Sequence, residues 1–244
     1  MPILSVPSWV IPGTYAENLR FLKDKKEILG VELLFFMYDD AIKNLLDSEW
    51  EEISGYAERF TFTAHLPDIL LPEHEELIAR VTPLVRHFIV HPNAENPINQ
   101  AALLRSWTER YGAVFLVENI FRGKGVSSLE YLLPHLGEDY GLCMDTGHLL
   151  LEEKSPSDFF KAWQKRQYRI EEIHLHGLDL EQSAVDGRLT DHRRLRENEP
   201  WLLELLPLLK GYRGIINLEV FSWEEVRAGI GVLRKFEAME GTVD

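Results

Sequence analysis

The chain has 244 residues, which is enough for one barrel-sized domain or for two smaller domains. Its 45% hydrophobic and 27% charged residues are typical of a soluble globular protein. Its formal net charge of −14, without a long Lys/Arg run, disfavours DNA or RNA as a partner. The single cysteine, Cys143, excludes an intramolecular disulfide, and its apolar neighbours predict that it packs in the core.

The N-terminal segment is not typical of a secretory signal, because it combines neither a positively charged start nor a long apolar stretch. No run of apolar residues approaches the roughly 18 needed to cross a bilayer. We therefore expect a cytoplasmic protein that acts on a small molecule and does not bind a membrane. The sequence does not indicate an oligomeric state.

Short apolar segments alternate with helical patterns along the first half of the chain. Pro97 suits the first position of a helix, with Asn96 as its N-cap. In chain order we predict a strand at 3–6, a helix at 14–22, a strand at 30–36, a helix at 41–56, a strand at 60–65, a helix at 73–84, a strand at 88–91 and a helix at 96–111.

The alternation continues in the second half, where residues 177–199 form the longest irregular stretch. Ser222 and Glu225 have the spacing of a capping box, which opens the last helix. We predict a strand at 113–118, a helix around 129–133, a strand at 142–144, a helix from 155, a strand at 170–176, a helix from 200, a strand at 215–220 and a helix from 222.

Strict alternation of eight strands with eight helical segments predicts a (β/α)8 TIM barrel, formed as a single domain by residues 1–244. A doubly wound open sheet is the alternative. A version of that sheet that binds a dinucleotide is disfavoured, because the first strand is not followed by a Gly-x-Gly-x-x-Gly motif.

The segment 140–148, with the sequence YGLCMDTGH, is the most informative part of the chain. Its apolar run ends abruptly at Asp145, and His148 follows three residues later. Both side chains could act as ligands of one divalent cation at the catalytic face of an α/β protein. The alternative is structural: Asp145 caps the next turn, and His148 is an ordinary buried histidine.

The same pattern recurs at the ends of the third to eighth predicted strands. Each of these strands closes with a side chain that can bind a metal: His65, His91, Glu118, Asp145, His174 and Glu219. In a barrel these residues project from one rim, and so many ligands indicate more than one cation. The number of imidazoles favours zinc, two or three ions, although manganese or iron suits the same ligands.

Other polar residues near the strand ends are weaker candidates. His176 alternates with His174, so both can face the pocket; we favour His174 as the ligand and His176 as a substrate contact. Asp191 and His192, in the loop after the seventh strand, could add ligands, and Arg122 could contact a phosphate. We expect three further histidines at the surface: His74, His87 and His135.

From His65 to Glu219 the motifs resemble the xylose-isomerase-like barrel superfamily, which includes the apurinic-site endonucleases (AP endonuclease family 2) and sugar isomerases or epimerases. The resemblance rests on the segments His65-Leu66-Pro67, His91-Pro92, Glu118-Asn119, Asp145-Thr146-Gly147-His148, Ile173-His174-Leu175-His176 and Leu218-Glu219.

The two branches of this superfamily imply different metal sites. Epimerase-like members hold one metal with residues matching Glu118, Asp145, His174 and Glu219. Endonuclease-like members hold three zinc ions and also use residues matching His65, His91 and His148, all of which are present here. Their Asp-x-His pair after the seventh strand is replaced by Thr190-Asp191-His192, so the resemblance does not assign the third metal's ligands.

Further motifs are similar to the cobamide-remodelling phosphodiesterases of the CbiR type in the same superfamily. They are Asn18-Leu19-Arg20, His174-Leu175-His176-Gly177, Asp191-His192-Arg193-Arg194-Leu195 and Leu218-Glu219-Val220-Phe221-Ser222. This resemblance implies cleavage of the phosphodiester in the nucleotide loop of a corrinoid.

Together these features predict a metal-dependent hydrolase that cleaves a phosphodiester, with Glu118 bridging two cations and a third cation near His148. The alternative is a metal-dependent isomerase or epimerase of a sugar or sugar phosphate, in which Glu118 and Glu219 flank the substrate as an acid/base pair around one metal. A barrel that binds without catalysis is disfavoured by the complete set of ligands.

Overall fold

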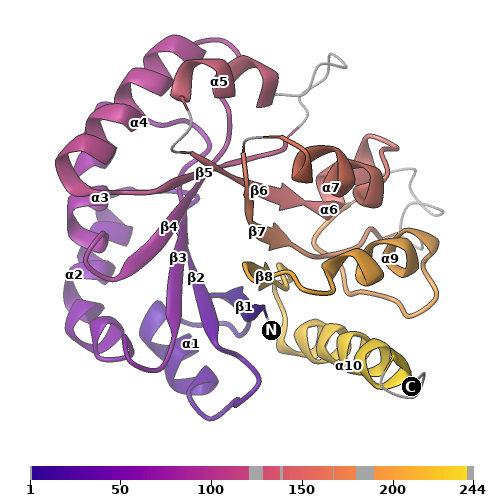
Figure 1. Ribbon diagram of the computed structural model, residues 1–244. Coiled ribbons are helices and arrows are strands. Elements are labelled where there is room, and N and C mark those ends of the chain that lie inside the picture. Colours follow the sequence, from indigo (N-terminus) through magenta and orange to yellow (C-terminus); the bar gives the residue numbers. More distant parts are fainter. Residues whose placement is uncertain (1, 121–128, 138–139, 167, 180–189, 241–244) are drawn as a thin grey trace.

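The computed structural model describes residues 2–120, 129–137, 140–166, 168–179 and 190–240, and it is a (β/α)8 barrel (Figure 1). Its parallel strands pair in sequence order, and β8 pairs with β1, so the barrel is closed and the open-sheet alternative is wrong. The strands are β1 (Ile3–Pro7), β2 (Gly30–Leu34), β3 (Thr61–His65), β4 (Val85–Val90), β5 (Phe115–Glu118), β6 (Gly141–Asp145), β7 (Ile170–His174) and β8 (Ile215–Asn217).

Helices cover the outside of the barrel (Figure 1). Local capping explains several of their starts: Thr14 makes a capping box with Glu17, and the Ser155 and Ser222 hydroxyls each accept a backbone N–H three residues on. The helices are α1 (Tyr15–Leu22), α2 (Asp40–Ser54), η1 (Pro72–His74), α3 (Glu75–Val81), α4 (Pro97–Tyr111), α5 (Leu129–Leu136), α6 (Thr146–Leu151), α7 (Pro156–Gln164), α9 (Pro200–Leu205), η2 (Leu206–Leu209) and α10 (Trp223–Glu240).

Several elements differ in detail from the sequence prediction. The helix predicted at 73–84 is a 3-10 turn followed by α3, which ends at Val81. The seventh strand ends at His174, two residues early, because Gly177 leaves the barrel to form an antiparallel bridge with Arg193. The short helix α6 was not predicted, and it begins directly after Asp145.

The apolar core lies mainly between the barrel and the helices. Along β4, for example, Phe88 and Val90 belong to this outer core, whereas Ile89 between them does not. Ile89 instead packs with Leu116 and Cys143, and by the alternation of a strand these three face the barrel interior. Cys143 is fully buried, as predicted, and its Sγ also lies within 4.8 Å of donor atoms of Glu118 and His174.

The other side of the barrel interior is polar. Glu32 on β2, Thr63 on β3, Glu172 on β7 and Asn217 on β8 are all at most 1% exposed. Register places Glu32 beside Thr63, and the Thr63 hydroxyl donates to a Glu172 carboxylate oxygen at 3.2 Å. TIM-barrel interiors are usually filled with branched apolar side chains, so these buried polar residues are unusual for the fold.

The prediction that His74 and His87 are surface residues was wrong, because both are buried. His74 lies in η1 and its Nδ1 accepts the backbone N–H of Leu71. His87 lies within β4, since that strand begins at Val85, earlier than predicted. Burial lowers the pKa of His87 to about 4, so this side chain is neutral. His135 is exposed, as expected.

Within the described ranges, no helix combines the length and the apolar character that a membrane span requires.

Candidate metal centre

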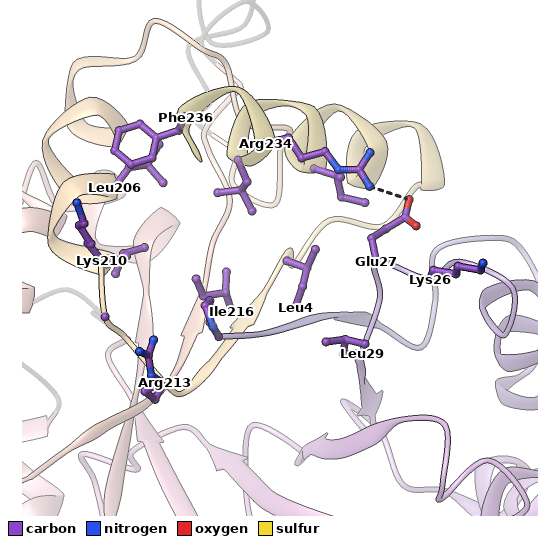
Figure 2. A pocket seen from close by; sticks show the side chains of 15 residues that line it. Leu4, Lys26, Glu27, Leu29, Leu206, Lys210, Arg213, Ile216, Arg234 and Phe236 are labelled. Carbon is purple, nitrogen blue, oxygen red and sulfur yellow. Dashed lines mark ion pairs between the residues drawn. The ribbon is translucent and has the colours of Figure 1, made fainter. Parts of the chain in front are cut away.

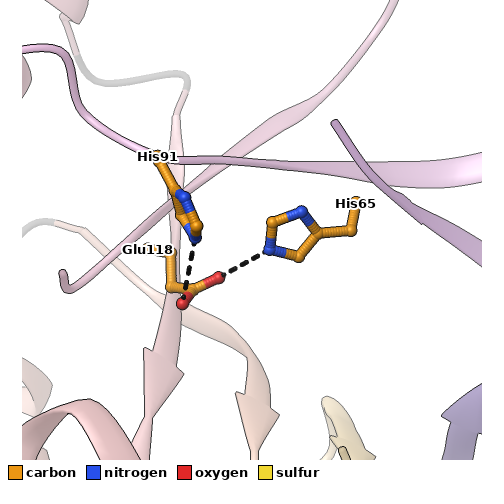
Figure 3. A group of neighbouring side chains, drawn as sticks. All are labelled: His65, His91 and Glu118. Carbon is orange, nitrogen blue, oxygen red and sulfur yellow. Dashed lines mark hydrogen bonds and ion pairs between the residues drawn. The ribbon is translucent and has the colours of Figure 1, made fainter. Parts of the chain in front are cut away.

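The predicted strand-end residues converge around one carboxylate, Glu118 at the end of β5. Its Oε2 lies 3.2 Å from Nε2 of His65 and 3.5 Å from Nδ1 of His174. Its Oε1 lies 3.4 Å from Nε2 of His91 and 2.9 Å from Nδ1 of His148. Figure 3 shows the rings of His65 and His91 directed at this carboxylate from two sides. One buried carboxylate therefore lies within reach of four imidazoles from four elements.

Asp145 and Glu219 form a second part of the centre around His174. Nδ1 of His174 lies 3.0 Å from Oε2 of Glu219 and 3.8 Å from Oδ2 of Asp145. Both carboxylates are at most 2% exposed, so their charges need compensation. The Asn119 side chain donates to the carbonyl of Asp145 and accepts its N–H, which fixes the turn that carries this carboxylate.

The structural interpretation of Asp145 as a cap is confirmed, and the same side chain also faces two histidines of the centre. Its Oδ1 accepts the backbone N–H of His148 at 2.6 Å and so caps α6. Its Oδ2 faces the His174 and His176 rings. The cap explains the geometry, because it turns the chain so that the His148 side chain points back toward Glu118.

The loop after β7 brings a third group of donors together. Oδ2 of Asp191 lies 3.6 Å from Nε2 of His148, and Nε2 of His192 lies 3.8 Å from Oδ1 of Asp191. His192 has a left-handed backbone with φ of 54°, a conformation that costs free energy and recurs at functional sites. Asp191 and His192 thus both lie close to His148. The sequence alone did not show which of the two would do so.

His176 lies in the same group but makes different contacts. Its Nδ1 accepts the His192 backbone N–H at 2.9 Å, so a neutral ring carries its hydrogen on Nε2. That Nε2 lies 2.9 Å from Oδ2 of Asp145 and donates to it. The ring fits only because residue 147 is glycine, since a Cβ there would lie 2.0 Å from the His176 Cε1.

Two of the histidines around Glu118, His91 and His148, have displaced pKa values. Burial lowers the pKa of His91, but the charges of Glu118 and Asp68 outweigh it and raise the pKa to about 9. Burial likewise lowers the pKa of His148, whereas Asp145 and Glu118 raise it to about 10. Burial raises the pKa of Glu118, yet the neighbouring imidazoles hold it well below its usual range. The centre therefore consists of carboxylate–imidazolium pairs that a cation can replace.

Several residues of the centre were not identified from the sequence. The Asp68 carboxylate, after β3, accepts from Nδ1 of His91 at 2.8 Å, and Glu32 accepts from Nε2 of His174 at 3.0 Å. Glu32 could have been identified from the sequence, because it is a lone carboxylate within the apolar run of β2. Arg122, predicted to contact a phosphate, lies outside the described residues. Asn18, from the second resemblance, holds the loop after β1 through bonds to Val10 and Ile11.

Exposed apolar side chains border one side of the centre. They come from the loops after β8, β1 and β2, which are neighbours in the barrel. Phe36 and Phe221 are each 39% exposed, and their rings lie 4.8 Å from His65 and 5.0 Å from His192. Trp9 and Met37 are 57% and 69% exposed and, with Phe36, line a cavity of about 220 Å³.

A larger cavity, about 500 Å³, lies at the opposite end of the barrel (Figure 2). Leu4 and Ile216 of the barrel, Leu206 and Phe236 line it, with an ion pair of 4.0 Å between Arg234 and Glu27 at its edge. None of the potential donors described above lines this cavity.

No protein-family model and no curated protein sequence matches this chain. Solved structures do match it. Endonuclease IV from Thermus thermophilus aligns over 98% of this chain and 100% of its own, at 15% identity and a TM-score of 0.59. N-acetylneuraminate lyase from Fusobacterium nucleatum aligns over 99% of this chain and 76% of its own, at 15% identity and a TM-score of 0.56. UMP synthase from Leishmania donovani aligns over 97% of this chain and 53% of its own, at 11% identity and a TM-score of 0.53. At these identities the likeness shows the barrel fold alone.

Proposed function

We propose that this protein is a divalent-metal-dependent hydrolase that cleaves a phosphodiester in a small-molecule substrate. The observation that carries the proposal is the position of Glu118, a buried carboxylate within 3.5 Å of ring nitrogens of four histidines. A single-metal isomerase needs fewer donors than this. The full-length alignment with endonuclease IV is consistent with the superfamily that the sequence motifs resemble.

The residues present fit divalent cations. Within the described part of the chain, three buried donor atoms that face the centre have no hydrogen-bond partner: Nε2 of His91, Nδ1 of His174 and Oε2 of Glu219. The donors form three groups, two of which share Glu118. We assign them as His65, His91 and Glu118; Glu118, Asp145, His174 and Glu219; and His148, Asp191 and His192. Imidazole and carboxylate donors suit zinc, and also manganese or iron.

The chemistry divides between the cations and the chain. Cations bound here would acidify the attacking water and neutralise charge on the phosphate. The chain holds the ligands in place: Asp68 orients His91, Asn119 fixes the turn at Asp145, and His176 donates to the Asp145 carboxylate. We therefore assign His176 to the support of Asp145.

The exposed aromatic side chains favour a substrate with an apolar ring next to the phosphodiester. Phe36 and Phe221 lie 6.4 Å apart and both touch histidines of the centre, so a ring held there would lie next to the cations. The net charge of −14 argues against a nucleic acid. A corrinoid, the substrate class implied by the second sequence resemblance, is therefore the first compound to test.

Replacing His91 with alanine tests the number of cations. We expect protein purified without chelator to hold two or three metal ions per chain by elemental analysis, and the variant to hold about one fewer. Hydrolysis of bis(p-nitrophenyl) phosphate should fall in parallel, and the exposed His135→Ala is the matched control. One metal per chain, unchanged in His91→Ala, would refute the hydrolase and favour the isomerase with Glu118 and Glu219 as the acid/base pair.

Replacing Phe36 with alanine tests the ring-bearing substrate. We expect KM for bis(p-nitrophenyl) phosphate to rise roughly fivefold, because the ring loses on the order of 1 kcal/mol of aromatic contact, with kcat little changed. The KM for methyl p-nitrophenyl phosphate, which lacks the second ring, should rise less. Leu203→Ala, at a 50% exposed residue of α9, is the control. Equal changes in KM for both substrates would contradict the assignment.

A further inference from the structure

The His174 ring connects two different environments inside the barrel. Its Nδ1 faces the candidate metal centre, 3.0 Å from Glu219 and 3.5 Å from Glu118. Its Nε2 faces the polar barrel interior, 3.0 Å from Oε2 of Glu32. A neutral imidazole has one N–H and one lone pair, so the position of the hydrogen decides which side can bind a metal.

We propose that Glu32 is a positioning residue that holds His174 in the tautomer with its hydrogen on Nε2 and its Nδ1 lone pair directed at the metal centre. The inference rests on the proposed function in one respect, that His174 is a metal ligand. The tautomer is a property of the neutral ring, so it can be measured in metal-free protein at a pH that deprotonates His174.

Glu32 is held firmly enough to impose this tautomer. It lies in the middle of β2 and is fully buried, and its Oε1 accepts a hydrogen bond from Nδ2 of Asn217 at 3.1 Å. A carboxylate that accepts at both oxygens offers its partner no hydrogen. Nε2 of His174 must therefore be the donor, and its bond is charge-assisted in a fully buried site.

Glu172 provides an internal comparison. It is also fully buried in the barrel interior, and its carboxylate lies within 4.8 Å of the donor atoms of Glu32 and His174. Its hydrogen bond, however, is with Thr63, and Oε2 has no partner among the described residues. Two carboxylates with equal burial thus differ in whether they bond to His174.

His91 shows the same arrangement at the other side of the centre, where Asp68 accepts from Nδ1 at 2.8 Å and leaves Nε2 facing Glu118. The Asp68 side chain is 50% exposed, whereas Glu32 is fully buried. Because exposure weakens such a bond, we expect Glu32 to have the larger effect on its histidine.

The test compares the Glu32→Leu and Glu172→Leu variants, which remove equal carboxylates from the same interior. In metal-free protein with ¹⁵N-labelled histidine, at a pH raised until the His174 ring is neutral, the ring nitrogen shifts report the tautomer, and His174→Asn identifies the signals. We expect His174 of the wild type and of Glu172→Leu to carry its hydrogen on Nε2, and Glu32→Leu to lose this preference. Zinc titration should show one site weakened roughly 10- to 100-fold in Glu32→Leu only.

A second pair covers the case in which a leucine variant does not fold. Glu32→Gln keeps a weaker acceptor, so it should keep the tautomer and weaken zinc roughly tenfold, whereas Glu172→Gln should bind as the wild type does. The inference is overturned if wild-type His174 carries its hydrogen on Nδ1, or if the Glu32 and Glu172 variants weaken zinc equally. A correct tautomer in a protein that binds no metal would refute the proposed function and leave this inference standing.

Discussion

Replacing Glu118 with glutamine is expected to remove hydrolysis and to lower the metal content by two ions per chain. Glu118 is the carboxylate that two of the proposed donor groups share, and a neutral amide binds a divalent cation far less well than a carboxylate. Cations contribute several kcal/mol to the stabilisation of transition-state charge, so the rate should fall roughly 10³-fold or more. Elemental analysis and hydrolysis of bis(p-nitrophenyl) phosphate measure the two effects.

The matched control for this variant is Glu172→Gln. Burial, and then the charge of Glu32, raise the pKa of Glu172 well above its usual range, so a neutral amide is a milder change at this position than at Glu118. We expect this control to keep the metal content and the activity of the wild type. If Glu118→Gln instead retains its metals, Glu118 is not a shared ligand and the proposed centre is wrong.

The metal-free protein should lose stability as the pH rises from about 6.5 to about 10. The unfolded pKa of histidine is near 6.5, whereas the folded pKa is about 9 for His91 and about 10 for His148. A raised folded pKa stabilises the fold fully below 6.5, and this stability disappears as the pH passes the folded value. The decrease in the free energy of unfolding should amount to several kcal/mol, measured by urea denaturation after chelation.

The metal-loaded protein should not show this decrease, because a ligand histidine is already deprotonated. Zinc affinity should accordingly increase with pH over the same interval, with release of protons on binding. The variant His148→Asn should reduce the slope of the metal-free profile, and His135→Asn, at an exposed position of α5, should not. A metal-free profile that is flat between pH 6.5 and 10 would show that the two histidines are not paired with Glu118 and Asp145.

The sequence by itself determined the fold and the main donors, for one physical reason. Apolar strands alternating with amphipathic helices have few ways to bury their surfaces, and a closed parallel barrel is one of them. In such a barrel all strand ends meet at one rim, so donors far apart in the chain, such as His65 and Glu118, had to converge. That argument needs only the order of the residues and their spacing.

Only the tertiary structure decided how each donor is held. Glu32 and His174 are 142 residues apart and meet across the barrel, and a local pattern does not reveal such a contact. Strand register placed Glu32 beside Thr63, and the early start of β4 buried His87. The direction of each side chain depends on the register of its strand and on the closure of the barrel. Both are set only when all the strands pack together. The chain order therefore predicted which residues gather, and the packed barrel decided which nitrogen of each histidine faces the centre.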